Sequence, residues 1–159
     1  ILNAYLQLKN ALVNDNQKET VSGGNTMLAA FSSFDMSQLN DARHKEYMEI
    51  FENSKEELEH IVKSPIDHQR EHFEVLSTDL KDLISLLGTD MTLYESFCPM
   101  ANNGNGAMWL SETEEIKNPY FGSSIQSPGA TIRLAEIWIL ATKPLIVCFD
   151  IAKQRRNTS

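Results

Sequence analysis

The segment PIDHQREHFEVLSTDLKDLISLLG, residues 65–88, decides the fold. Its apolar residues recur at intervals of three and four, which is the spacing of one face of an α-helix. Pro65 suits the first turn of a helix, and Gly88 suits the position just past its end. The segment therefore predicts a long amphipathic helix with an inward face made of Ile66, Phe73, Leu76, Leu80, Leu83, Ile84 and Leu87.

Three more helical patterns precede this segment. Asn40-Asp41 offers an N-terminal cap for the longest of them, and Ser64-Pro65 ends it. Gly23-Gly24 should weaken or delay the start of the second helix, because glycine is a poor helix former. The inward residues expected for the three helices, in chain order, are Ile1, Tyr5, Leu8 and Leu12, then Met27, Phe31 and Phe34, then Tyr47, Met48, Phe51, Leu58, Ile61 and Val62.

Short connections between long amphipathic helices favour antiparallel neighbours. The sequence therefore predicts an all-α, up-and-down four-helix bundle over residues 1–88. Residues 89–129 lack the helical period and carry Gly, Asn and Pro, which is typical of a long ordered loop or of short strands laid on the bundle. Trp109, Tyr120 and Phe121 are its expected anchors. With residues 130–159 as a tail, the 159 residues suit a single domain.

Charge and hydropathy exclude several classes of partner. The formal net charge of −8 repels a phosphate backbone, so no nucleic-acid partner is expected. The most apolar stretch, residues 134–151, is interrupted by Glu136, Lys143, Pro144 and Asp150. It falls short of the roughly 20 apolar residues that span a bilayer, so no transmembrane segment is expected. A chain that opens at Ile1 without Met is expected to be a mature or trimmed form.

The segment Cys98-Pro99-Met100 carries the candidate metal chemistry. Pro99 pushes Cys98 toward extended geometry, and side chains at i and i+2 of an extended segment share one face. Thiolate and thioether are soft ligands that favour Cu(I) and related ions. His44 shares the inward face of the third helix with Tyr47 and is a candidate third ligand. The plainer interpretation is that Cys98 and Met100 fill gaps in the core and that His44 is a core residue.

A disulfide would compete with the metal. The chain contains only two cysteines, Cys98 and Cys148, which is too few for a disulfide framework. The two can still pair in an oxidising compartment, whereas Cys148 in an apolar run is more typical of a buried thiol. A bridge between them would remove the thiolate that a metal needs.

The segment His68-Gln69-Arg70-Glu71-His72 matches H-x-x-E-H, in which two histidines one helical turn apart bind zinc and the glutamate activates water. This pattern is the basis of a third alternative, a zinc hydrolase. Both histidines lie roughly opposite Phe73, on the polar side of the predicted helix. The sequence therefore favours a solvated helix face here.

The motifs Cys98-Pro99-Met100-Ala101, Trp109-Leu110-Ser111 and Asn118-Pro119-Tyr120-Phe121-Gly122 resemble the domain-of-unknown-function 3347 family. Upstream, Leu8-Lys9, His44 and Gln69-Arg70 also look like that family, so the resemblance covers about residues 1–124. It implies a periplasmic or cell-envelope location. The Cys-Pro-Met segment is also similar to the end of some membrane-fusion subunits of heavy-metal efflux systems, which implies copper or silver handling.

The resemblance stops after Gly122. Ile125 and Pro128 stand where the family pattern continues with a second pair of sulfur ligands, and the tail from Ala130 to Ser159 matches nothing in it. Two hypotheses of different class remain beside the hydrolase. The first is a non-enzymatic envelope domain that binds Cu(I) or Ag(I) through Cys98, Met100 and His44, with a metal-efflux or envelope protein as partner. The second is a structural or protein-interaction module without metal.

Overall fold

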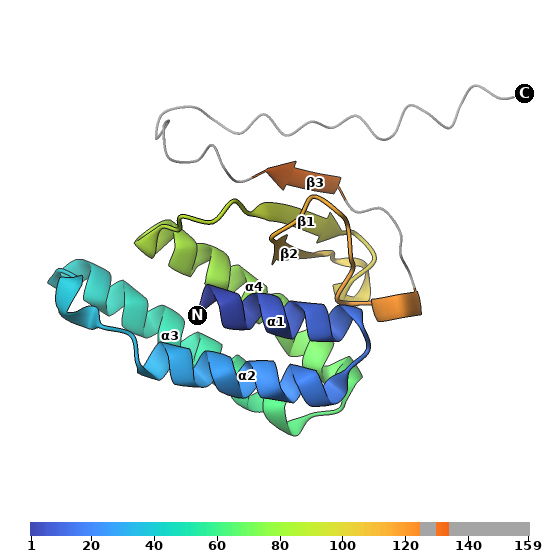
Figure 1. Ribbon diagram of the computed structural model, residues 1–159, viewed down its shortest axis with the longest axis horizontal. Coiled ribbons are helices and arrows are strands. Elements are labelled where there is room, and N and C mark those ends of the chain that lie inside the picture. The colour runs from blue at the N-terminus through green and yellow to red at the C-terminus, as the bar shows by residue number, and fades with distance from the viewer. Residues whose placement is uncertain (125–129, 134–159) are drawn as a thin grey trace, which may run out of the picture.

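The computed structural model describes residues 1–124 and 130–133, which form a helical bundle with a small sheet laid on it (Figure 1). The helices are α1 (Leu2–Val13), α2 (Gln17–Ser32), α3 (Asp41–Lys63) and α4 (Ile66–Leu87). A 3-10 helix, η1 (Met36–Gln38), lies between α2 and α3. The prediction of four helices followed by short strands is confirmed.

The ends of the helices follow from capping residues. The Oδ1 atom of Asn40 accepts a hydrogen bond from the backbone N–H of Arg43 at 3.0 Å and so caps α3. Asn16 caps α2 in the same way, with the backbone N–H of Glu19 at 3.1 Å. Gly88 follows α4 with φ at 80°, a left-handed conformation that glycine adopts at little cost. The predicted limits of α3 and α4 are thus confirmed.

The two glycines were expected to weaken or delay the second helix, and the delay is not seen. α2 begins at Gln17, so Gly23 and Gly24 lie inside it. A Cβ atom on Gly23 would lie 3.0 Å from the Cα of Leu8 in α1, which is closer than ordinary van der Waals contact. Because the glycine lets the two helices approach this closely, their packing offsets the poor helix propensity of glycine.

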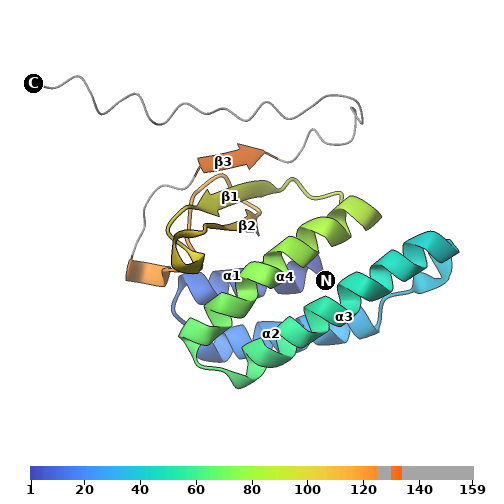
Figure 2. The ribbon, with the colours of Figure 1, turned by 180° about the vertical axis from the view of Figure 1, so that it is seen from behind.

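The core lies between the four helices and under the sheet. Tyr5 of α1 is fully buried and joins three elements, since its hydroxyl donates to Ser77 Oγ of α4 at 2.8 Å and accepts from the backbone N–H of Leu110 at 3.1 Å. In Figure 2, α3 and α4 lie side by side, and they pack along their lengths. The other large, fully buried side chains are Leu8, Leu12, Met27, Tyr47, Leu58, Ile61, Phe73, Leu76, Leu80, Leu93 and Trp109.

The sheet contains β1 (Tyr94–Cys98), β2 (Ala107–Ser111) and β3 (Ala130–Arg133), in the antiparallel order β2-β1-β3. Figure 1 shows β1 and β2 between the helices and β3. Trp109 of β2 is buried and meets Tyr120 edge to face at a centroid distance of 5.9 Å. Tyr120 also contacts Phe73 of α4 at 5.8 Å, so these aromatic rings attach the sheet and the loop after it to the bundle.

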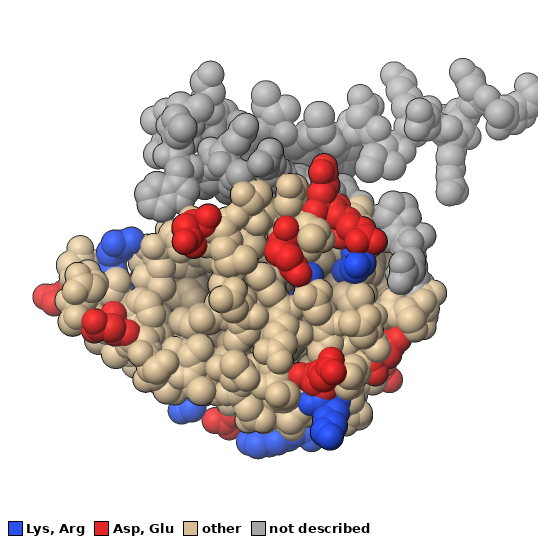
Figure 3. Space-filling model, viewed as in Figure 1, with Lys and Arg blue, Asp and Glu red and all other residues tan. Residues whose placement is uncertain are grey.

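The surface of the described residues carries both signs of charge. Figure 3 shows acidic and basic side chains in small groups, and neither sign forms a continuous patch on the face drawn. None of the helices in residues 1–124 combines the length and apolar character needed to cross a bilayer. Ile125, Pro128, Cys148 and the apolar tail from residue 134 onward lie outside the described residues.

Candidate metal centre

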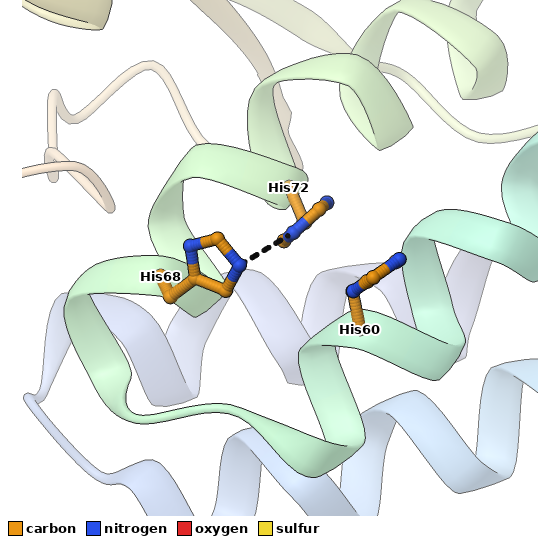
Figure 4. Close-up of side chains that lie close together, drawn as sticks. All are labelled: His60, His68 and His72. Atoms are coloured by element: carbon orange, nitrogen blue, oxygen red, sulfur yellow. Dashed lines mark hydrogen bonds between the residues drawn. The ribbon is translucent and has the colours of Figure 1, made fainter.

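Three histidines meet where the chain folds back from α3 to α4 (Figure 4). His60 lies near the end of α3, and His68 and His72 lie one turn apart at the start of α4. Pro65 ends α3 and suits the entry to α4, so the chain reverses there. One ring nitrogen of each histidine lies within 4.8 Å of the other two. We call these three residues the histidine triad.

The rings of the histidine triad face one another. The Nε2 atoms of His68 and His72 are 3.0 Å apart, and their rings are nearly perpendicular, at 89°. The ring of His60 stacks on that of His72 with a centroid distance of 4.4 Å and an interplanar angle of 7°. Two nitrogen ligands of a tetrahedral Zn²⁺ lie about 3.3 Å apart, from Zn–N bonds of about 2.0–2.1 Å. Because an imidazole coordinates through the lone pair in its ring plane, the His60 ring, now stacked on His72, must rotate before its nitrogen can join the same ion.

Two carboxylates fix the orientation of the rings. Glu71 lies 2.6 Å from Nδ1 of His68, and Glu57 of α3 lies 2.6 Å from Nδ1 of His72. This arrangement leaves Nε2 as the coordinating atom of each ring and is usual for metal-binding histidines, whose other ring nitrogen donates to a carboxylate. Glu57 is largely buried, with 17% of its side chain exposed, so its contact with His72 is well shielded from solvent.

A series of contacts runs from Glu71 through His68 and His72 to Glu57. The middle contact joins the Nε2 atoms of the two rings, and the outer two join their Nδ1 atoms to the carboxylates. A metal ion bound at both Nε2 atoms would replace the middle contact and leave the outer two in place.

Two further carboxylates of α4, Glu74 and Asp79, lie near Glu57 along the contact between α3 and α4, which we call the α3–α4 seam. Burial raises the pKa of Asp79 to about 6, and the charges of Glu57 and Asp82 act in the same direction, while a hydrogen bond from Ser54 opposes them. Burial also raises the pKa of Glu74, with a further contribution from Glu57. The seam thus holds carboxylates close together and partly out of water.

The sequence predicts that His68 and His72 lie on a solvated helix face, and the structure places His68 there, with His72 less exposed. His68 is exposed, but it contacts His72, which is largely covered, and both lie beside His60. The sequence pattern misses His60 because it belongs to another helix. Its position in the sequence could have indicated the contact. His60 and His68 lie at similar distances along the chain from the reversal at Pro65, so antiparallel packing of α3 and α4 places them side by side.

Cys98 and Met100 do not share one face. Cys98 ends β1 and is 3% exposed, whereas Met100 is 55% exposed. The backbone N–H of Ala101 donates to the carbonyl of Cys98 at 3.4 Å, so Pro99 and Met100 occupy the middle of a tight turn. The prediction assumed an extended segment, and the turn instead sends the two sulfur side chains into different surroundings.

His44 does not join the two sulfur residues. It is exposed near the start of α3, next to Arg43, whose guanidinium donates to the carbonyl of Leu86 at the end of α4. Met100 instead lines a pocket of about 320 Å³ together with Glu71, near the start of α4. The helix between Glu71 and Leu86 spans about 22 Å, at about 1.5 Å per residue. The three residues predicted as one ligand set therefore lie apart.

Comparison with family models gives one match. Residues 1–92 match the model described as protein of unknown function (DUF3347). The chain belongs to the DUF3347 family. No curated protein matches the chain, and no solved structure matches it.

The DUF3347 match covers the helices and ends before β1. All three residues of the histidine triad, and His44, lie inside the matched range, whereas Cys98 and Met100 lie beyond it. The family assignment predicted from the sequence is confirmed, over a shorter stretch than residues 1–124. The similarity to efflux proteins stays a prediction.

Proposed function

We propose that this DUF3347 protein is a non-enzymatic domain that binds a transition-metal ion through His60, His68 and His72. The observation that carries the proposal is the convergence of three imidazole nitrogens within 4.8 Å. Glu57 and Glu71 support it, because each carboxylate contacts Nδ1 of one ring, which leaves the Nε2 atoms of His68 and His72 facing each other. Exposed acidic residues gather without a metal in many proteins, but oriented imidazoles that converge from two helices are a more specific arrangement.

The donors favour divalent ions of intermediate softness. Imidazole suits Zn²⁺, Cu²⁺ and Ni²⁺, whereas Cu(I) and Ag(I) are selected by sulfur ligands. The soft-metal prediction rested on the sulfur atoms of Cys98 and Met100. Cys98 is buried whereas Met100 is exposed, and His44 lies near the other end of α4 from Met100. We therefore assign the primary site to the histidine triad and its ion to the divalent class. Metal handling in the cell envelope remains our proposal, and it rests on the family resemblance.

Binding is favoured over hydrolysis by the contacts of Glu71. In an H-x-x-E-H hydrolase the glutamate activates water, but here Glu71 holds the Nδ1 atom of His68 at 2.6 Å. Two pockets, of about 800 and 320 Å³, are formed near opposite ends of α4, and neither is lined by the histidine triad.

Isothermal titration calorimetry of the reduced, metal-free, full-length chain with Zn²⁺ and with Cu²⁺ tests the proposal. Replacing His60, His68 or His72 with alanine should weaken binding by at least about 100-fold, since each removes a ligand. His44→Ala is the matched control, because it removes an exposed histidine from the same helix as His60 and should leave the affinity unchanged.

Two results would contradict this assignment. Failure of the wild-type chain to bind either ion would favour the alternative of an interaction module without metal. If instead His44→Ala weakened binding as much as the triad variants did, the ligands would lie elsewhere. A parallel Cu(I) titration of the wild type and of Cys98→Ser tests the alternative in which Cys98 is a ligand. Only that alternative predicts a loss of Cu(I) affinity in the cysteine variant.

A further inference from the structure

A metal ion at the histidine triad would have three protein ligands and an accessible side. The group that converges within 4.8 Å consists of three residues, and no fourth His, Cys, Asp or Glu of the described residues belongs to it. His60 and His68 are both exposed. Zn²⁺ prefers four ligands, and a three-histidine site leaves one position for an outside donor.

The surface around that open position is acidic. Glu56 lies one helical turn before His60, on the same face of α3, and is exposed. Glu71 contacts His68 and has 71% of its side chain exposed, and Asp67 beside it has 94% exposed. Lys63, the basic residue nearest to the end of α3, is paired with Glu59 at 3.3 Å. A partner that approaches the ion therefore meets mainly negative charge.

We propose that the fourth ligand of the bound ion is a histidine supplied by a cationic segment of a partner protein, so that the metal joins the two; this rests on the proposed function. Imidazole is the donor type that the triad already uses, and a Lys/Arg-rich segment complements the acidic rim. A second copy of this chain is disfavoured as the donor, because its net charge of −8 would bring like charges together.

The test uses two short Lys/Arg-rich fluorescent peptides that are identical except for one position, which is His in one and Ala in the other. Their binding to the full-length chain is measured by fluorescence anisotropy, with saturating Zn²⁺ and with EDTA. The His peptide should bind the zinc-loaded protein at least about tenfold more tightly than the Ala peptide, and the difference should vanish in EDTA. Each peptide is also titrated with Zn²⁺ alone, to correct for metal that it binds by itself.

Two variants separate the parts of the proposal. Glu56→Gln should keep the affinity for Zn²⁺, because Glu56 contacts none of the coordinating nitrogens, but it should weaken binding of both peptides and reduce the salt dependence. His60→Ala should abolish the difference between the two peptides. An acidic peptide with the same single His should bind more weakly than the cationic one.

The experiments distinguish failure of this inference from failure of the proposed function. If calorimetry detects no metal binding, both proposals fail. If Zn²⁺ binds but the His and Ala peptides bind equally, the proposed function stands and this inference is overturned, because water then completes the site. A zinc-dependent dimer in light scattering without peptide would also overturn it, since a second copy would then supply the ligand.

Discussion

Replacing Gly23 with alanine tests the close approach of α1 and α2. Alanine is ordinarily the better helix former, by about 1 kcal/mol, so in an exposed helix the change would stabilise the protein. Here the new methyl group would lie 3.0 Å from both Cα and Cβ of Leu8. Its nearest contacts include backbone atoms, which cannot rotate away, so α1 must shift.

Overpacking of this kind typically costs about 1–3 kcal/mol. Set against the gain of about 1 kcal/mol in helix propensity, Gly23→Ala should lower the free energy of unfolding by up to about 2 kcal/mol. Urea denaturation followed by far-ultraviolet circular dichroism measures this change. The matched control is Ser22→Ala, an exposed neighbour in α2, which should stabilise slightly because it gains propensity without a contact. If Gly23→Ala were as stabilising as Ser22→Ala, the two helices would not be in close contact and the account of α2 would be wrong.

Three further predictions follow from buried polar groups. Because the pKa of Asp79 is raised to about 6, its charged form destabilises the fold, and the free energy of unfolding should fall as pH rises from about 4 to 7. Asp79→Asn should therefore raise the free energy of unfolding by about 1–2 kcal/mol at pH 8, after allowance for partial exposure, and change it little at pH 4. Urea unfolding at both pH values measures this difference. Tyr5→Phe should cost about 1–3 kcal/mol in the same assay, since it leaves the buried N–H of Leu110 without its acceptor and removes the hydrogen bond to Ser77. Glu57→Gln should lower the Zn²⁺ affinity by about 10- to 100-fold in calorimetry while circular dichroism stays unchanged, because the residue orients a ligand without being one.

Helices were predictable from this sequence because their signals are local. The spacing of Phe73, Leu76 and Leu80 and the capping residues Asn40 and Gly88 each act within a few residues of the chain. The glycines of α2 gave the opposite signal, because the contact that requires Gly23 comes from α1 and is invisible to a local pattern. The register of β3 against β1 was not predictable for the same reason, since it depends on pairing between distant segments.

The candidate site shows the same division between local and distant signals. His68 and His72 were visible as a pair one turn apart on one helix. His60 joins them only through the packing of α3 on α4, so the sequence did not reveal a third histidine beside the pair. The geometry expected for Cys98 and Met100 differs at the local level, because Pro99 is compatible with both an extended segment and a turn, and the contact from Ala101 to Cys98 shows a turn.

The acidic α3–α4 seam gains a physical rationale if a cation binds there. Carboxylates that are partly withdrawn from water and close to one another destabilise a fold, and the raised pKa values of Asp79 and Glu74 express that cost. Glu57 contributes to both shifts, after burial, and also contacts the ring of His72. A divalent cation at the histidine triad would reduce the repulsion among these groups, and the stability gained would grow with ion concentration, reaching about 2.7 kcal/mol at 100 times the dissociation constant. Without a cation, replacing Glu57 with glutamine relieves repulsion toward Asp79 and Glu74 but weakens the contact with His72, so the two effects oppose each other. With saturating Zn²⁺ the same change should clearly destabilise the protein, and this dependence on zinc in thermal unfolding is not expected of a purely structural glutamate.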